Sequence, residues 1–153
     1  MAFIGTNSLT QLLNSSEVIS PFDKDRIKNG AYELSLAYSK QRKAFGKEIM
    51  HHQAIQFKLA DMATKIEAAR LLCLKAAWEK DNNLDYTLSS SMAKVFASEA
   101  AMWIATEAVQ IHGGYGFVKE YHVERMMRDA KITQIYEGTS EVQRIVISRS
   151  ILK

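Results

Sequence analysis

HQAIQFKLADMATKIEAARLLCLKA, residues 52–76, is the stretch of sequence that decides the fold. Its apolar residues recur every three or four positions, which places them along one face of a single long α-helix. Those residues are Ile55, Leu59, Met62, Ile66, Ala69, Cys73 and Ala76. A helix with a continuous apolar face must bury that face against other helices, so the pattern predicts a helical bundle.

The sequence before this helix predicts another helix. Ser20, Pro21 and Asp23 have the order of an N-cap residue, a first-turn proline and a first-turn acid. Apolar residues then recur with helical spacing up to about Gln41. We expect Gly46 to stop this helix.

Further helices are expected after residues 81–83, whose Asp and Asn side chains favour a turn. A third helix covers about residues 86–110, a short helical piece follows at 123–129, and a last helix starts at Ser140, which forms a capping box with Gln143. The side chains expected to face inward are Leu88, Met92, Val95, Trp103, Thr106 and Val109 on the third helix and Val142, Ile145 and Val146 on the last.

Together these segments predict an all-α fold, an antiparallel four-helix bundle with long second and third helices. Residues 1–20 are rich in Ser, Thr and Asn and are expected to be a poorly ordered lead-in. The bundle domain is therefore expected to span residues 21–153.

The composition is typical of a globular protein that stays out of membranes, with 47% hydrophobic and 24% charged residues and no apolar run long enough to cross a bilayer. The one cysteine, Cys73, cannot form an internal disulfide, and no signal or transit peptide is recognisable, so we expect a cytoplasmic location. The net charge of +3 is too mild to predict a nucleic-acid partner. No metal site is predicted, because the four histidines lack metal-ligand spacing on a helix face.

In a helical bundle, chemistry is expected at the breaks between helices, because loops carry binding groups while packed helices form the core. The first break is residues 42–47, RKAFGK. Its cations could simply complement the dipole at a helix C-terminus. Alternatively, Arg42 could bind phosphate oxygens with its planar guanidinium while Phe45 offers a face to a ring.

The second break is the glycine-rich run from Gln110 to Gly116. It does not have the spacing of a dinucleotide-binding fingerprint, and no strand precedes it. It could be a tight turn between helices, or its glycines could expose backbone N–H groups to a phosphate or a flat ring.

The third break is residues 135–141, IYEGTSE, which hold the carboxylate of Glu137 just ahead of a helix. Such an acid could simply stabilise the helix dipole, with no catalytic role. Alternatively, Gly138 frees the backbone so that Glu137 projects into a cavity and acts as a base whose strength is set by burial and by the helix end.

These breaks, in this order, resemble the acyl-CoA dehydrogenase family. The resemblance runs from about Ala31 to the C-terminus and is carried by five strings in register: QRKAFGK (41–47), HHQAIQFKLADM (51–62), AVQIHGGYGF (108–117), VERMMRDAKI (123–132) and IYEGTSEVQR (135–144). The chain looks like the C-terminal helical domain of such an enzyme, of the short-chain, medium-chain or butyryl-CoA type. The β-domain that holds the flavin ring in the family has no match in residues 1–20, so the chain alone is expected to be inactive.

The resemblance implies an oxidoreductase that forms a double bond between the α and β carbons of an acyl-CoA thioester. Glu137 would remove the α-proton while FAD accepts the β-hydrogen as hydride. Tyr136, Gly138 and Arg149 would contact the acyl-CoA. The residues implied in FAD binding are Arg42, Phe45, Gln53, Gln110, Gly113, Gly114, Thr139 and Glu141, of which the first six would reach across a dimer interface.

The resemblance further implies a homo-oligomer, a dimer or tetramer, with electron-transfer flavoprotein as the electron acceptor. The competing hypothesis is a non-catalytic helical oligomerisation module derived from this family. A module of that kind has no need for Glu137, Arg42 and the paired glycines together. A nucleic-acid binder that uses the basic residues at 40–47 would bind with a steep salt dependence.

Overall fold

The structure is a computed structural model that describes residues 30–153. The expected lead-in at residues 1–20 and the expected helix start at Ser20 lie outside the described residues. The helices are α3 (Ala31–Gln41), α4 (Gln53–Asp81), α5 (Thr87–His112), α6 (Val123–Thr133) and α7 (Ser140–Ile151). The shorter elements are β1 (Lys43–Ala44), β2 (Lys47–Glu48) and the 3₁₀ helices η2 (Ile49–His51) and η3 (Gly113–Phe117).

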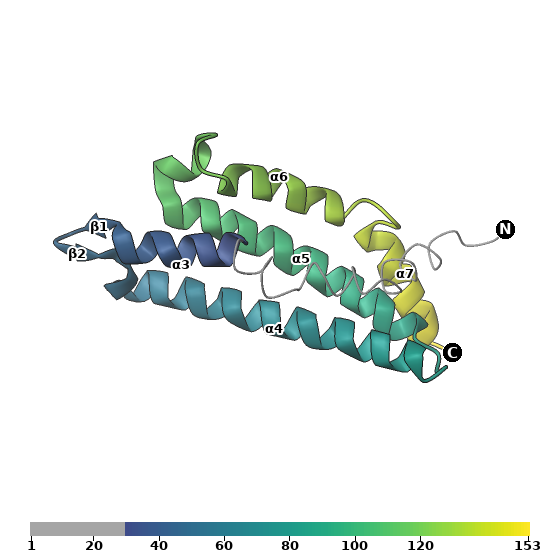
Figure 1. The fold of residues 1–153 in the computed structure, drawn as a ribbon. Helices are drawn as coiled ribbons and strands as arrows, with labels where there is room; N and C mark the ends of the chain where they lie inside the picture. The colour runs from purple at the N-terminus through teal and green to yellow at the C-terminus, as the bar shows by residue number, and fades with distance from the viewer. Residues whose placement is uncertain (1–29) are drawn as a thin grey trace.

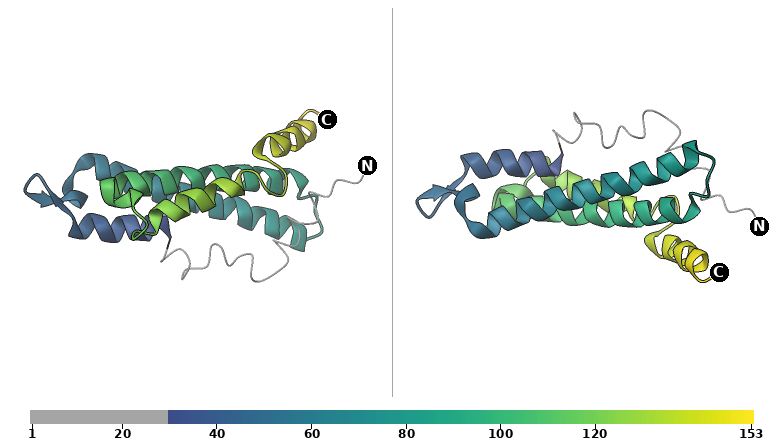
Figure 2. Two further views of the ribbon diagram at one scale, coloured as in Figure 1. Left: turned by 90° about the horizontal axis from the view of Figure 1, so that it is seen from above. Right: turned by 90° about the horizontal axis from the view of Figure 1, so that it is seen from below.

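The helices form an antiparallel bundle around α5, which packs against α3, α4, α6 and α7 (Figure 1). The β1–β2 hairpin lies at one end of the bundle, and α7 leaves the other end obliquely (Figure 2). The predicted all-α bundle is therefore confirmed. Within residues 30–153, no helix combines the length and the apolar character needed to span a membrane.

The predicted apolar face of α4 forms one wall of the core. Met62, Ala69 and Ala76 are buried, and Ile55, Leu59 and Ile66 pack against the central apolar cluster. That cluster also contains Ile49 from η2, Val123 from α6, and Ala100, Ile104, Ala108 and Ile111 from α5. The spacing of the apolar residues in 52–76 thus identified the buried face of α4, the longest helix.

The predicted inward face of α5 was wrong in part. Trp103 and Val109 pack against the core, but Thr106 is exposed. The buried positions of α5 belong mostly to small residues: Ser89, Ser90, Ser91, Ala93, Ser98, Ala100, Ile104, Ala105, Ala108, Ile111 and His112. A helix with neighbours on several sides needs short side chains where those neighbours come close, and the spacing of large apolar residues does not mark such positions.

The segment after α3 also differs from expectation. Helix α3 ends at Gln41 as predicted, but Gly46 belongs to a hairpin in which Lys43 pairs with Glu48 and Ala44 with Lys47. The turn residues Phe45 and Gly46 have φ of 52° and 80°. Positive φ at both central residues is typical of a type I′ turn, which matches the twist of two short antiparallel strands.

The start of α7 also differs from the prediction. Thr139, not Ser140, is the N-cap, and its hydroxyl accepts a hydrogen bond from the N–H of Val142 at 3.3 Å. The buried residues of α7 are Ser140 and Gln143, whereas Val142 and Ile145 are 40% and 48% exposed. The fully buried residues of α7 thus lie in its first turn, and of the face expected to be buried only Val146 is partly covered.

Gly116 provides a test of the packing between η3 and α5. A Cβ atom at this position would lie 2.5 Å from the carbonyl oxygen of Val109, and a backbone atom cannot move aside cheaply. We expect Gly116→Ala to lower the free energy of unfolding by about 1–3 kcal/mol, measured by urea denaturation. At Gly114 an added Cβ meets nothing within 4 Å, so Gly114→Ala should change stability by less than about 0.5 kcal/mol. Equal losses in the two variants would contradict this account.

Candidate functional site

Most of the residues singled out in the sequence lie in two groups, one toward each end of the bundle. Arg42, Phe45, Gly113 and Gly114 line a pocket of about 740 Å³ at the hairpin end. Tyr136 to Glu141 form the connection between α6 and α7 and the start of α7, toward the other end (Figure 1). We call these the hairpin pocket and the Glu137 turn.

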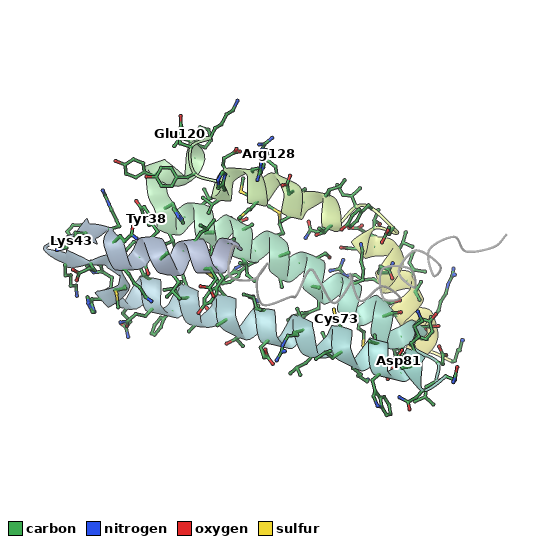
Figure 3. All side chains as sticks on the ribbon, viewed as in Figure 1. Tyr38, Lys43, Cys73, Asp81, Glu120 and Arg128 are labelled. Atoms are coloured by element: carbon green, nitrogen blue, oxygen red, sulfur yellow. The ribbon has the colours of Figure 1, made fainter. Side chains whose placement is uncertain are left out.

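The hairpin pocket lies between the end of α3, the hairpin and η3. Figure 3 shows Tyr38 on α3, whose ring stacks on the His112 imidazole with the ring centroids 4.3 Å apart. The Arg42 guanidinium carbon lies 5.7 Å from the centroid of the Tyr115 ring, a favourable cation–π distance. The Phe45 side chain is 96% exposed, so its ring is free to pack on a second molecule.

The backbone of the glycine run is accessible from this pocket. Gly113 has a φ of 60°, and neither at Gly113 nor at Gly114 would an added Cβ meet any atom within 4 Å. An anionic or planar group can therefore approach the backbone at Gly113 and Gly114 closely. The open backbone, the Arg42 cation and the aromatic rings together fit a phosphate attached to a flat ring system.

The sequence did not identify every residue of the hairpin pocket. Tyr38, Ile49 and His52 also line it, and the Nε2 atom of His52 lies 3.1 Å from the carbonyl oxygen of Ala44. The expected cofactor residues Gln53 and Gln110 are exposed and are not among the lining residues. Their role in cofactor binding stays a prediction.

Burial shifts the pKa of His112, one of the two histidines that line this pocket. Desolvation lowers the pKa of His112, an effect opposed by the hydrogen bond between its Nδ1 and the carbonyl oxygen of Ala108 at 2.7 Å. Burial also raises the pKa of Tyr38, against the opposing charge of Arg42. At neutral pH the rings of His112 and Tyr38 are therefore neutral, and Arg42 adds a positive charge to the pocket.

The Glu137 turn holds its carboxylate in an unusual backbone conformation. Glu137 has a φ of 53° and Gly138 a φ of 88°. A left-handed conformation in a residue other than glycine costs about 1–3 kcal/mol and is found most often at functional sites. The N–H of Ser140 closes the loop by donating to the carbonyl oxygen of Gln134 at 3.0 Å.

The Glu137 side chain is half-buried and forms no salt bridge with any residue between 30 and 153. It is therefore not held in a surface ion pair that would explain its position. Two neighbouring groups respond to its charge. Burial raises the pKa of Tyr136, and the Glu137 charge raises it further. Burial lowers the pKa of Lys94, and the charges of Glu137 and Glu141 oppose that shift.

The start of α7 offers groups that could meet an anion or a hydroxyl-bearing ligand. The Ser140 Oγ atom is buried and has no hydrogen-bond partner among the described residues. The sequence predicted Ser140 only as a helix-capping residue, although it adjoins the predicted site residue Thr139. The pKa of Glu141 is lowered by a hydrogen bond from its own backbone N–H, and then by the Thr139 hydroxyl. Arg149 is exposed in the last turn of α7, which separates it from the Glu137 turn.

No group of three or more His, Cys, Asp or Glu side chains is arranged to hold a metal ion in the part of the chain that the structure describes. The residues above instead offer a carboxylate, backbone N–H groups and aromatic rings.

Comparison with known proteins gives these features a family context. Residues 26–152 match the sequence model described as "Acyl-CoA dehydrogenase, C-terminal domain". A probable acyl-CoA dehydrogenase, YngJ of Bacillus subtilis, is 58% identical over 127 residues, which cover 83% of this chain and 33% of that protein. The caffeyl-CoA reductase-Etf complex subunit CarC of Acetobacterium woodii is 54% identical over 83% of this chain and 34% of its own length.

A solved structure shows the same arrangement of helices. Butyryl-CoA dehydrogenase from Megasphaera elsdenii superposes with a TM-score of 0.79 and 54% identity, over 80% of this chain and 32% of that one. The chain thus spans about a third of the length of the relatives it matches.

The buried histidine of the hairpin pocket gives a pH-dependent prediction. Because the pKa of His112 in the folded chain is below the ordinary histidine value of 6.5, the unfolded chain takes up the proton first as the pH falls. The contribution to stability is complete above pH 6.5 and is lost as the pH falls toward the lowered pKa. The slope from this one proton is at most about 1.4 kcal/mol per pH unit.

We expect His112→Gln to reduce the loss of unfolding free energy between pH 7 and pH 5, measured by urea denaturation. His122→Gln, at an exposed histidine, is the matched control. Parallel stability curves for the wild type and His112→Gln would show that His112 does not titrate as described.

Proposed function

Because this chain belongs to the acyl-CoA dehydrogenase family, as its C-terminal domain, we propose that it provides the catalytic base for dehydrogenation of an acyl-CoA thioester between the α and β carbons. Glu137 is that base. The observation that carries the proposal is the strained, half-buried carboxylate of Glu137, which has no salt bridge to explain it. The activity belongs to a longer protein, since the relatives are about three times the length of the match.

The backbone of the Glu137 turn supports this role. The α-proton of a thioester is a weak acid, so the thioester oxygen needs hydrogen-bond donors as negative charge develops on it. Among the described residues, the N–H groups of Glu137 and Gly138 donate no hydrogen bond within the chain. We assign the Glu137 N–H as one donor to the thioester oxygen, with Tyr136 and Gly138 against the acyl chain.

The residues present also fit FAD, the cofactor that the family implies. A bound flavin supplies the acceptor for the β-hydrogen, which leaves as hydride. At the start of α7, the partnerless Ser140 Oγ and the Thr139 hydroxyl lie where polar atoms of the cofactor could bind them. At the other end, Arg42 and the open backbone at Gly113 and Gly114 suit the phosphates and the adenosine.

These two groups of residues serve two different FAD molecules. Lys94, beside the Glu137 turn, and Gly113, in the hairpin pocket, are 19 positions apart along α5 and its C-cap. At 1.5 Å per residue they are about 28 Å apart, which is longer than an extended FAD molecule. We therefore propose a homo-oligomer in which each chain contributes its Glu137 turn to one active site and its hairpin pocket to the next.

The family membership also supports proposals for the substrate and for the electron acceptor. A glutamate directly before the glycine of this turn favours a short-chain, medium-chain or glutaryl-type substrate, and a butyryl-CoA dehydrogenase is among the similar structures. One relative is a subunit of a complex with Etf, which supports electron-transfer flavoprotein as the electron acceptor. We propose a cytoplasmic location.

A non-catalytic oligomerisation module is the second candidate function. Large apolar side chains are exposed on α4 and at the end of α7, among them Trp78 at 60% and Ile151 at 61%. Such surfaces favour contact with other chains or domains. This candidate requires nothing of Glu137, so replacing that residue separates the two functions.

The decisive test uses a chimera in which residues 26–152 replace the matching third of the short-chain-specific acyl-CoA dehydrogenase of Clostridium acetobutylicum, a relative 51% identical to this chain. We expect the chimera to bind FAD and to bleach its absorbance when an acyl-CoA is added. Glu137→Gln should bind FAD equally well but slow the bleaching about a hundredfold or more, because the general base is lost.

The matched control is Glu67→Gln, which removes an exposed carboxylate that pairs with Arg70 on its own helix. This control should bleach at the rate of the unmodified chimera. An active Glu137→Gln chimera would refute the role of Glu137, and a chimera that binds FAD but never responds to acyl-CoA would favour the oligomerisation module.

A further inference from the structure

Two side chains from different helices hold the consecutive carbonyl groups of the Glu137 turn. The Nε2 atom of Gln143, in the first turns of α7, donates to the carbonyl oxygen of Glu137 at 3.3 Å. The Nζ atom of Lys94, on α5, donates to the carbonyl oxygen of Gly138 at 2.7 Å. The two peptide planes that follow Glu137 are therefore fixed at their oxygens.

This fixation matters because the turn is strained. Both Glu137 and Gly138 have positive φ, and a non-glycine residue in that region relaxes unless its surroundings hold it. The contact with Gln143 is within the same loop and helix start. The contact with Lys94 instead reaches back 44 residues to α5, so it ties the turn to the helix around which the other helices pack.

The chemistry of Lys94 suits more than a structural tie. Its ammonium is half-buried on a helix whose neighbouring positions, Ala93 and Ser98, are buried. Desolvation penalises this cation, and the charges of Glu137 and Glu141 favour it. A neutral donor would satisfy the Gly138 carbonyl without the desolvation penalty, so the positive charge beside the base requires a reason of its own.

We propose that Lys94 is a positioning residue for the reaction: through the Gly138 carbonyl, and together with Gln143, it holds the Glu137 backbone in the left-handed conformation that aims the carboxylate at the substrate. The proposal rests on the proposed role of Glu137 as the base. Lys94 does not itself exchange a proton with the substrate. Its removal should leave substrate binding largely intact and misdirect the carboxylate.

The first experiment needs neither cofactor nor substrate. Hydrogen–deuterium exchange is measured on the 153-residue chain and on Lys94→Met, which keeps the length of the side chain but removes the donor and the charge. The amide of Ser140, which donates to Gln134 across the turn, should exchange about tenfold faster, the factor expected for the loss of one charge-assisted hydrogen bond. Amides in the middle of α4 should keep the wild-type rate.

Two further variants define the contact. Gln143→Met removes the donor to the Glu137 carbonyl and should also speed exchange in the turn, whereas Lys94→Arg retains both a donor and a positive charge and should restore most of the protection. Lys75→Met, at an exposed lysine of α4, is the matched control and should leave exchange in the turn unchanged.

The second experiment measures kinetics in the chimera described above. Lys94→Met should lower kcat about tenfold or more while KM changes less than about threefold, because substrate contacts persist and only the aim of the base is lost. Lys94→Arg should recover most of kcat. A lysine with a merely structural role would instead lower the amount of folded enzyme without changing kcat per bound FAD.

The outcomes separate this inference from the proposed function. An inactive unmodified chimera would refute the proposed function, while the exchange data would still show whether Lys94 holds the turn. An active chimera in which Lys94→Met changes neither kcat nor the exchange of the Ser140 amide would overturn the positioning role alone. Faster exchange with unchanged kcat would also overturn it, because the turn would then not need to be held for catalysis.

Discussion

The close packing of four helices around the small side chains of α5 is the constraint on which the rest of the structure depends. Alanine and serine at the buried positions of α5 let α3, α4, α6 and α7 approach it. Gly116 extends this principle past the end of the helix, since its Cα faces the Val109 backbone without room for a side chain. The hairpin pocket and the Glu137 turn are both attached to this helix, the first through η3 and the second through Lys94.

Rigid packing of this kind allows the connections to adopt costly conformations. The residues other than glycine that have positive φ in the described chain are Phe45, Asn83 and Glu137. Phe45 is at the tip of the hairpin and Glu137 precedes α7, so two of the three belong to the candidate sites. Strain persists only where the surroundings determine the backbone. The helices on either side of each turn provide that determination.

The sequence was sufficient to predict the helical bundle, whereas the site residues that it indicated stay predictions. The spacing of Ile55 to Ala76 identified the buried face of α4, because that helix is covered on one side and its apolar side chains are large. It was not sufficient for α5, where covered positions carry small residues, or for α7, where Val142 and Ile145 remain exposed. Hydrophobic periodicity reports how apolar a face is and cannot report which neighbour comes close to it.

The residues of the site that the sequence missed were missed for a related reason. Ser140 and Lys94 are ordinary helix residues until the fold buries the Ser140 hydroxyl and directs the Lys94 ammonium at a carbonyl 44 residues away. Tyr38 becomes part of the hairpin pocket only when the end of α3 meets His112. A motif marks a loop, whereas the groups that support the loop come from helices distant in sequence and carry no local signature.

The separation of the two turns along α5 has a consequence for assembly. A helix of this length makes the distance between the Glu137 turn and the hairpin pocket a fixed property of the chain. If one FAD molecule must contact both kinds of group, the shortest solution is to bring two chains together so that the hairpin of one approaches the Glu137 turn of another. The nearly complete exposure of the Phe45 ring at the hairpin tip fits this arrangement, because exposed aromatic side chains are typical of surfaces that contact other molecules. In the assembly that we propose, oligomerisation and catalysis would both follow from the same geometry.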